Sequence, residues 1–352
     1  MKHTPQCRQA FDPLCGRLRQ TTTILEGMFM KTDCRFTRAQ QFAKPLLMTA
    51  SLATGLSFAV ATYAAEKGTP SSRAREIRLS GDQVTLPIVM VREFPFIEGS
   101  VSGVEGKFML DTAAEDALSL NSHRIPIANL ETVGTGVFGS GQSFTSKLAP
   151  VVKDIRIASL HYTAATRVTA QNAVQLEGIT PDFLGWFGFH AWDGYTMKLD
   201  YRKLQAIFYR KTPAADYLAG ERLIAELPFD VRRRPNIPVM PAKLGGVDIT
   251  AAFDTGAYGY LYVGKETKEK LVALKILKQN DGEDDFAVTG LSLGGVPVPD
   301  IKSIRVATAS FPASRPTGLP SENLLWIGHG FLREYKTVWD YQGKKIYLLD
   351  NR

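Results

Sequence analysis

Residues 103–114 read GVEGKFMLDTAA, and residues 246–257 read GVDITAAFDTGA. Both segments begin with Gly-Val, continue through a short apolar run and end in an Asp-Thr pair, at Asp111 and Asp254. A short apolar run that ends at a polar turn is typical of a buried β-strand. The two segments therefore predict two equivalent strands, each followed by an Asp-Thr loop.

A second pair of segments repeats downstream. WFGFHAWDGYTMKLDY begins at Trp186 and WIGHGFLREYKTVWDY begins at Trp326. The positions that they share are Trp186 and Trp326, Gly188 and Gly328, Tyr195 and Tyr335, Asp200 and Asp340, and Tyr201 and Tyr341. Self-similarity at a fixed spacing indicates that one structural unit occurs twice.

Most of the local patterns predict strands. Residues 155–168 and 291–306 each predict a hairpin, the second with a Gly-Gly turn, and residues 258–263 predict a strand. Residues 265–279 predict one clear helix, because leucines recur there every three residues. The chain is therefore expected to be mostly β, in two similar lobes.

The repeat also predicts the domain boundaries. We expect a leader at residues 1–65, a linker or propeptide at 66–80, a first lobe at 81–212, a linker at 213–225 and a second lobe at 226–352. In the leader, Arg35, Arg38 and Lys44 precede a weakly apolar run from Pro45 to Ala65. This order is typical of a secretory signal, read from Met28 or Met30 and cleaved after Ala64 or Ala65. We expect a periplasmic or secreted protein; the alternative is an uncleaved leader that anchors the chain to the membrane.

Net charge and cysteine content limit the binding partners and the reaction chemistry that we expect. The formal net charge is +7, but residues 1–64 alone hold eight Lys and Arg and three Asp and Glu, so the lobes are nearly neutral. The basic run at residues 232–235 is expected to be a solvated strand edge, and no nucleic-acid partner is predicted. All three cysteines lie in the leader, which suits an oxidising compartment and leaves no thiol nucleophile in the lobes.

The glycine-rich stretch VGTGVFGSGQSF at residues 133–144 allows two interpretations. Gly134, Gly136 and Gly139 have the spacing of a dinucleotide-binding loop. Such a loop must open a long helix, but the residues after Gly141 favour a strand and reach Pro150 within a few positions. We therefore expect a mobile hairpin, and we expect no cofactor.

The two Asp-Thr motifs can act together in catalysis if a twofold axis relates the lobes. Asp111 and Asp254 would then face one another, and two carboxyl groups in contact share one proton because they cannot readily both ionise. One can act as a base toward water while the other acts as an acid toward a carbonyl group. Thr112 and Thr255 can fix the loops across the axis, and Gly256 allows the backbone to pass close to the carboxylates.

With these features the sequence resembles the aspartic protease superfamily, specifically the retropepsin-like and pepsin-like enzymes of the bacterial exported type. The resemblance rests on DTGA at Asp254, DTAA at Asp111 and the hydrophobic-hydrophobic-Gly elements that end at Gly188 and Gly328. It implies a bilobal fold of two β-barrel-like lobes with pseudo-twofold symmetry, an Asp111 and Asp254 dyad, and a flap formed by the glycine-rich hairpin, with Gly134, Gly136, Gly139 and Gly141 against a peptide or protein substrate. Since one chain supplies both lobes, a monomer is sufficient for a dyad, and the oligomeric state stays open.

One position departs from the family pattern. Ala113 stands where the family has glycine, and its methyl group forbids some backbone angles. This departure favours an alternative function, a catalytically weak or inactive pseudoprotease that binds peptides or a partner protein in the same place. A structural protein of the cell envelope would leave the repeated Asp-Thr pair unexplained.

Other chemistries lack their motifs. The histidines His123, His161, His190 and His329 have no metal-ligand spacing, so no obligate metal is expected, and no serine-nucleophile turn is present. The repeated Asp200 and Asp340 are expected to have structural roles in closing strands. Trp186 and Trp326 are expected to pack in the core or between the lobes. The sequence does not decide whether Glu115 and Asp116 form a salt bridge or contact substrate.

Overall fold

The computed structural model describes residues 75–138, 141–257, 261–282, 284–311, 314–320 and 322–351. These residues belong to a compact unit from Gly68 to Arg352. The predicted leader and the first part of the predicted linker, up to residue 74, lie outside the described residues. Within the described ranges, no helix is both long enough and apolar enough to cross a membrane.

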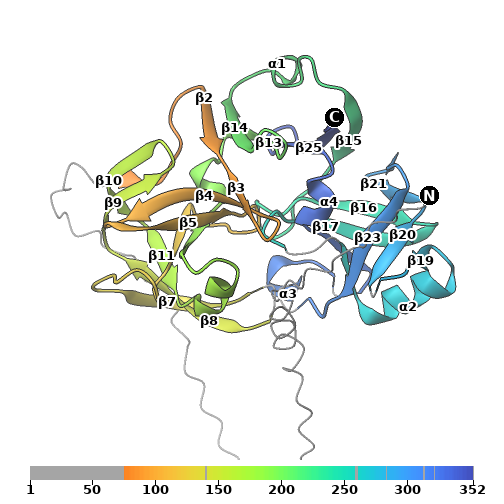
Figure 1. Ribbon diagram of the computed structural model, residues 1–352, viewed down its shortest axis with the longest axis horizontal. Helices are drawn as coiled ribbons and strands as arrows, with labels where there is room; N and C mark the ends of the chain where they lie inside the picture. The colour runs from red at the N-terminus through yellow and green to blue at the C-terminus, as the bar shows by residue number, and fades with distance from the viewer. Residues whose placement is uncertain are drawn as a thin grey trace, which may run out of the picture. The chain divides into compact units, whose positions relative to one another are not determined.

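The first half of the chain forms an eleven-stranded sheet in the described residues (Figure 1). Its strands are β1 (Arg75–Glu76), β3 (Val89–Val91), β4 (Phe94–Val101), β5 (Val104–Leu110), β6 (Leu118–Asn121), β7 (Glu131–Val137), β8 (Ser143–Ala149), β9 (Val152–Ile157), β10 (Leu160–Thr166), β11 (Val168–Gln171) and β12 (Phe183–Phe187). The strand that leads to Asp111, β5, lies between β4 and β12, antiparallel to the first and parallel to the second. β12 in turn pairs with β6 in antiparallel orientation.

The second half repeats this arrangement in a nine-stranded sheet of described residues. Its strands are β16 (Val239–Leu244), β17 (Val247–Phe253), β18 (Leu261–Val263), β19 (Leu277–Gln279), β20 (Asp285–Val288), β21 (Leu291–Leu293), β22 (Val296–Pro297), β23 (Ile301–Thr308) and β24 (Leu324–Ile327). β17 leads to Asp254 and pairs antiparallel with β16 and parallel with β24, which pairs antiparallel with β18. The same pairing pattern around both Asp-Thr loops explains the sequence repeat.

A third sheet, with six strands among the residues that the structure describes, joins the two halves. Its strands are β2 (Gln83–Pro87), β13 (Tyr195–Asp200), β14 (Gln205–Arg210), β15 (Leu223–Pro228), β25 (Lys336–Asp340) and β26 (Lys345–Leu349). At its centre β13 pairs antiparallel with β25, and Lys198 lies opposite Val338. These two residues are equivalent in the sequence repeat, so the pseudo-twofold axis passes through this pair.

Helices are short in the described residues. They are η1 (Val174–Gly178), η2 (Phe189–Ala191), α1 (Ala214–Tyr217), α2 (Lys265–Ala273), α3 (Ser314–Thr317) and α4 (His329–Leu332). The helix predicted at residues 265–279 was too long. Lys275 has a left-handed backbone conformation (φ 57°) that ends α2, and Leu277 begins strand β19.

Most of the predicted strands and hairpins are present. Both predicted hairpins form, the first as β9 and β10 and the second as β21 and β22 around Gly294 and Gly295. The strand predicted from residue 258 is described from Leu261 onward as β18, and residues 258–260 lie outside the described residues. The basic run at residues 232–235 lies in a loop, so the strand edge predicted there was wrong.

Candidate active site

The two Asp-Thr loops begin where two equivalent strands end. Asp111 follows β5 and donates its backbone N–H to the Phe187 carbonyl of β12 at 3.2 Å, and Asp254 follows β17 and donates to the Ile327 carbonyl of β24 at 3.1 Å. Each aspartate is thus held by the parallel strand beside it. Phe187 and Ile327 belong to the hydrophobic-hydrophobic-Gly elements, which explains why these elements repeat together with the Asp-Thr loops.

The two threonines bind the loops to each other. The backbone N–H of Thr112 donates to Thr255 Oγ1 at 3.0 Å, and the N–H of Thr255 donates to Thr112 Oγ1 at 3.0 Å. The Thr255 hydroxyl also donates to the Leu110 carbonyl at 2.9 Å. Both threonine side chains are fully buried, so these reciprocal bonds form away from water. The arrangement fixes the carboxyl groups of the two lobes against one another.

The carboxyl groups of Asp111 and Asp254 are buried and hydrogen-bond to each other. Burial raises the pKa of both groups above that of an ordinary aspartate. For Asp254 the negative charge of Asp111 raises the pKa further, so that it lies well above the ordinary value. For Asp111 the backbone N–H groups of Ala113 and Ala114 and the bond from Asp254 oppose the effect of burial. The two carboxyl groups therefore titrate as a coupled pair, which can share one proton.

The positions after the two threonines differ for a structural reason. Gly256 donates its N–H to Asp254 Oδ1 at 2.7 Å, and Ala113 donates equivalently to Asp111 Oδ1 at 2.7 Å. A Cβ atom at Gly256 would lie 2.7 Å from Asp111 Oδ1 and closer still to its Cγ, so glycine is required there. The Ala113 methyl group instead packs against a cluster of the second half that includes Val239. Ala113 therefore keeps the hydrogen bond to the carboxylate, and its methyl group has room.

Two side chains that the sequence did not single out for this site bind the loops, and a third binds one of these two residues. The Trp326 indole N–H donates to Asp254 Oδ2 at 3.2 Å, although only packing was predicted for this residue. Asn236, which is buried, donates its side-chain N–H to the Thr112 carbonyl at 2.9 Å. Tyr341 donates its hydroxyl to the Asn236 carbonyl at 3.0 Å. The repeat pointed to Trp326 and Tyr341 without revealing these bonds, and Asn236 carries no signal in the sequence.

The glycine-rich stretch forms an antiparallel hairpin of β7 and β8, and no helix follows it. The stretch is therefore a hairpin, and strand β9 (Val152–Ile157) comes next in the chain. At the end of the hairpin Phe138 packs on Phe144, with ring centres 4.4 Å apart, and stacks on Trp186 at 5.9 Å. Phe138 and Ala114 both pack against the apolar cluster that contains Trp186, so the end of the hairpin and the first Asp-Thr loop share this cluster.

Each described glycine of the hairpin has its own physical role. Gly134 lies at a shift in strand register and has open space around it. At Gly136 a Cβ atom would collide with the ring of Phe144. Gly141 adopts a left-handed conformation (φ 95°) in the turn. Gly139 lies outside the described residues.

The charged residues beside the first loop form contacts within the protein. Glu115 forms an ion pair with Arg234 of the second half, and Asp116 accepts a hydrogen bond from the Thr169 hydroxyl at 2.7 Å. The repeated Asp200 and Asp340 accept backbone N–H bonds in the turns of their hairpins, from Lys203 and Gly343, each at 2.8 Å. These contacts are structural, as expected for Asp200 and Asp340.

The histidines do not assemble a metal site. Within the described residues, no three His, Cys, Asp or Glu side chains lie together as metal ligands could. His123 contacts Glu177 and His161 contacts Asp154, both at solvent-exposed positions. His329 is buried against the ring of Tyr201, with ring centres 4.9 Å apart.

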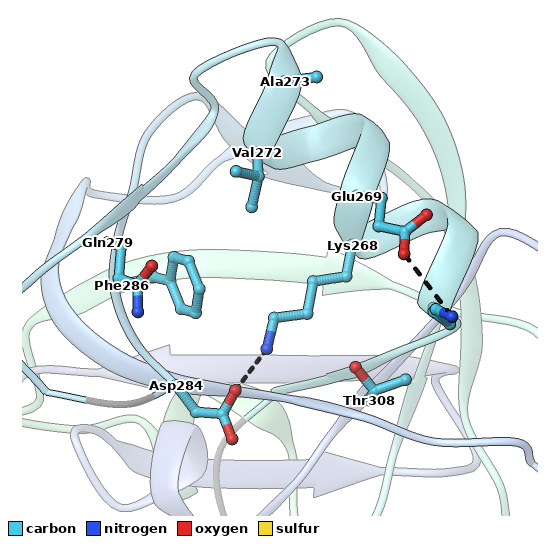
Figure 2. A pocket seen from close by; sticks show the side chains of 9 residues that line it. Lys268, Glu269, Val272, Ala273, Gln279, Asp284, Phe286 and Thr308 are labelled. Atoms are coloured by element: carbon cyan, nitrogen blue, oxygen red, sulfur yellow. Dashed lines mark hydrogen bonds and ion pairs between the residues drawn. The ribbon is translucent and has the colours of Figure 1, made fainter.

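A separate hollow of about 620 Å³ lies beside α2 and contains no residue of the Asp-Thr loops or the flap (Figure 2). Its charged side chains pair with one another: Lys268 reaches Asp284 at 2.5 Å, and Lys265 lies 4.0 Å from Glu269. Phe286 supplies an apolar wall beneath Lys268. Its charged groups are thus pairs of opposite sign, unlike the two carboxyl groups of Asp111 and Asp254.

Comparison with solved structures identifies the fold. The chain is similar to Basic 7S globulin from soybean, with a TM-score of 0.50 and 9% sequence identity over 78% of this chain and 96% of that chain. It is also similar to aspartic proteinase from Irpex lacteus, with a TM-score of 0.48 and 12% identity over 76% of this chain and 97% of that chain. No model of a protein family matches the sequence, and no curated protein matches it. The predicted mostly β fold of two similar halves is confirmed, and the soybean globulin shares it.

Proposed function

We propose that this protein is an exported aspartic endopeptidase that hydrolyses peptide bonds with a water molecule activated between Asp111 and Asp254. The observation that carries the proposal is the contact between these two buried carboxyl groups, at equivalent places in a repeated fold. A carboxyl pair that shares one proton holds an acid and a base within reach of one carbonyl group.

We propose that Asp111 acts first as the base and Asp254 first as the acid. Asp111, in its ionised form, removes a proton from water as the water oxygen attacks the peptide carbonyl carbon. Asp254 gives its proton to the carbonyl oxygen, so that a tetrahedral diol forms. The diol then collapses: Asp254 takes back a hydroxyl proton, the C–N bond breaks, and Asp111 passes its proton to the leaving nitrogen. The pair ends with one shared proton, as it began, and the free enzyme is regenerated.

Binding follows from the position of the hairpin. An extended peptide can pair its backbone with a strand edge, as an added β-strand does. The predicted flap carries exposed residues along β7 and is anchored through Phe138 on Trp186, beside the first loop. We propose that it covers the substrate and limits the access of water during the reaction. Export to the periplasm or to the outside remains part of the proposal, on the grounds of the leader sequence alone.

The test is cleavage of an unfolded protein by the purified chain between about pH 4 and 7, the range for a shared-proton pair. Asp254→Asn and Asp111→Asn are expected to lower kcat by at least about 1000-fold, since an amide can neither hold the acidic proton nor act as the base. Asp340→Asn is the matched control, because Asp340 is also repeated but accepts a turn N–H bond. Full activity of Asp254→Asn would refute the dyad.

The same experiment decides on the alternative function. If the native protein binds peptides without cutting them, and both Asp→Asn variants bind as well as it does, the pseudoprotease hypothesis replaces the enzyme. The room that the Ala113 methyl group finds in the second half favours the enzyme, because the departure from the family pattern costs the carboxylate no hydrogen bond.

A further inference from the structure

The two aspartates have different hydrogen-bond donors, and one side chain, Trp326, causes the difference. Trp326 lies on β24 directly beside Ala252 of β17, the strand that leads to Asp254. Its indole N–H donates to Asp254 Oδ2 at 3.2 Å, while Oδ1 accepts the Gly256 N–H at 2.7 Å. Both oxygens of this carboxyl group are therefore held by donors from its own half, which fixes the plane of the group.

The equivalent residue of the first half has another role. Trp186 pairs in register with Met109 and stacks on Phe138 of the flap at 5.9 Å, and it meets Phe183 edge-on at 4.9 Å. Its indole makes no hydrogen bond with Asp111 among the described residues. The donors to Asp111 are instead backbone N–H groups, those of Ala113 and Ala114 on Oδ1.

The residues next to the hydrogen-bonding N–H groups of the two loops supply no side-chain donor for the second carboxyl oxygen, Oδ2, of either aspartate. The residues that follow Ala113 and Gly256 are Ala114 and Ala257, whose methyl groups cannot donate a hydrogen bond. An indole N–H donates but never accepts, so Asp254 Oδ2 faces Trp326 as an acceptor. Asp254 Oδ2 is therefore the oxygen that carries no proton when it accepts the indole N–H bond.

We propose that Trp326 is a positioning residue for the reaction, which holds the Asp254 carboxyl group and keeps it acidic enough to release its proton to the substrate. The inference rests on the proposed peptide hydrolysis and adds a side chain that holds its acid and lowers the pKa of that acid. The physical reason is that a donor stabilises the ionised form of a carboxyl group more than the protonated form.

Other groups around Asp254 act on its pKa in both directions. Burial and the charge of Asp111 raise the pKa of Asp254, and the N–H groups of Gly256 and Trp326 oppose them. The remaining titratable group of the described residues that interacts with the pair is Tyr341, whose own pKa is raised well above its usual value by burial and by both aspartates. Tyr341 stays neutral in the working range of the enzyme, so it does not add a charge that changes with pH.

The test compares Trp326→Phe with Trp186→Phe in the full chain through the pH dependence of kcat/KM. Trp326→Phe is expected to lower kcat about tenfold with little change in KM, and to move the alkaline limb of the profile upward by about one pH unit, since the acid loses a stabilising donor. Trp186→Phe is expected to leave both limbs in place, whatever it does to KM through the flap. Unchanged limbs in Trp326→Phe, or an equal shift in Trp186→Phe, would overturn the proposal.

A second variant isolates the hydrogen bond if phenylalanine disturbs folding. Benzothienylalanine at position 326 keeps the shape of the bicyclic ring and lacks only the N–H group, so it must give the same shift of the alkaline limb. A carbon NMR titration of the Asp254 carboxyl group gives the result without any substrate. If the native protein cleaves no peptide, the proposed function fails, while a higher Asp254 pKa in both variants still supports the role of Trp326, and an unchanged pKa refutes it.

Discussion

At the scale of single residues, Gly256 explains why one Asp-Thr loop keeps its glycine while the other does not. The Gly256 Cα lies against the carboxyl group of Asp111, across the interface between the halves. The matching face of Ala113 lies against apolar side chains of the second half. The pseudo-twofold symmetry is therefore broken where a methyl group fits on one side and collides with a catalytic candidate on the other.

The corresponding prediction concerns Gly256→Ala. The new methyl group must push Asp111 away from Asp254, and a displacement of this kind costs about 100-fold in kcat/KM. The control is Ala113→Gly, which removes a methyl group, keeps the N–H bond to Asp111 and should leave kcat/KM within about threefold. Peptide cleavage by both variants is the measurement, and equal activities would contradict the explanation.

At the scale of elements, the hairpin of β7 and β8 depends on packing as well as on glycine flexibility. Phe144 lies opposite Gly136 across the hairpin and contacts Phe138, which reaches Trp186. This chain of rings connects the flap to the sheet of the first half. A glycine at position 136 is what leaves space for the ring of Phe144.

Gly136→Ala should therefore disturb substrate binding more than Gly134→Ala does. The added methyl group at position 136 displaces Phe144 and loosens Phe138, whereas the same group at position 134 meets open space. We expect KM for a peptide to rise about tenfold in Gly136→Ala, equivalent to about 1.4 kcal/mol of binding free energy, and to stay within about twofold in Gly134→Ala. Steady-state kinetics of the two variants distinguish this account from general glycine flexibility, which would make both equally harmful.

The same elements indicate what the sequence could predict. The strands, the Asp-Thr loops and the hairpins depend on apolar runs and turn residues that are close together in the sequence, so they could be predicted. The repeat of these segments predicted the two halves. The end of α2 was not, because the backbone conformation of Lys275 and the pairing of Leu277 with Val288 decide it. The bonds of Trp326 and Asn236 were also beyond prediction, since they join residues 72 and 124 positions away.

At the scale of the whole molecule, a buried histidine links stability to pH. His329 is 1% exposed, and burial, with a smaller effect of Arg333, lowers its pKa to about 3. An exposed histidine in the unfolded chain has a pKa of about 6.5. The folded protein therefore holds His329 neutral, while the unfolded chain binds a proton as the pH falls below about 6.5. Stability from this residue is present above that pH and is lost as the pH falls toward 3.

The substitution His329→Phe should remove the loss of stability that His329 causes at low pH. Between pH 6.5 and 4 we expect the wild-type free energy of unfolding to fall by roughly 2–3 kcal/mol through His329, and this part of the fall should be absent in the variant. Urea unfolding at pH 7, 5.5 and 4 measures the difference. The same pH dependence in both proteins would show that His329 is accessible to protons in the folded state.

The central claim is that Asp111 and Asp254 share one proton, and a carbon NMR titration of the aspartate carboxyl groups from pH 3 to 8 tests it most directly. The account predicts two separate steps for the pair, with Asp254 still protonated well above the value of about 4 of an ordinary aspartate. In Asp254→Asn a single step should remain, that of Asp111. Two independent titrations near pH 4 in the wild-type protein would contradict the claim, and with it the proposed mechanism.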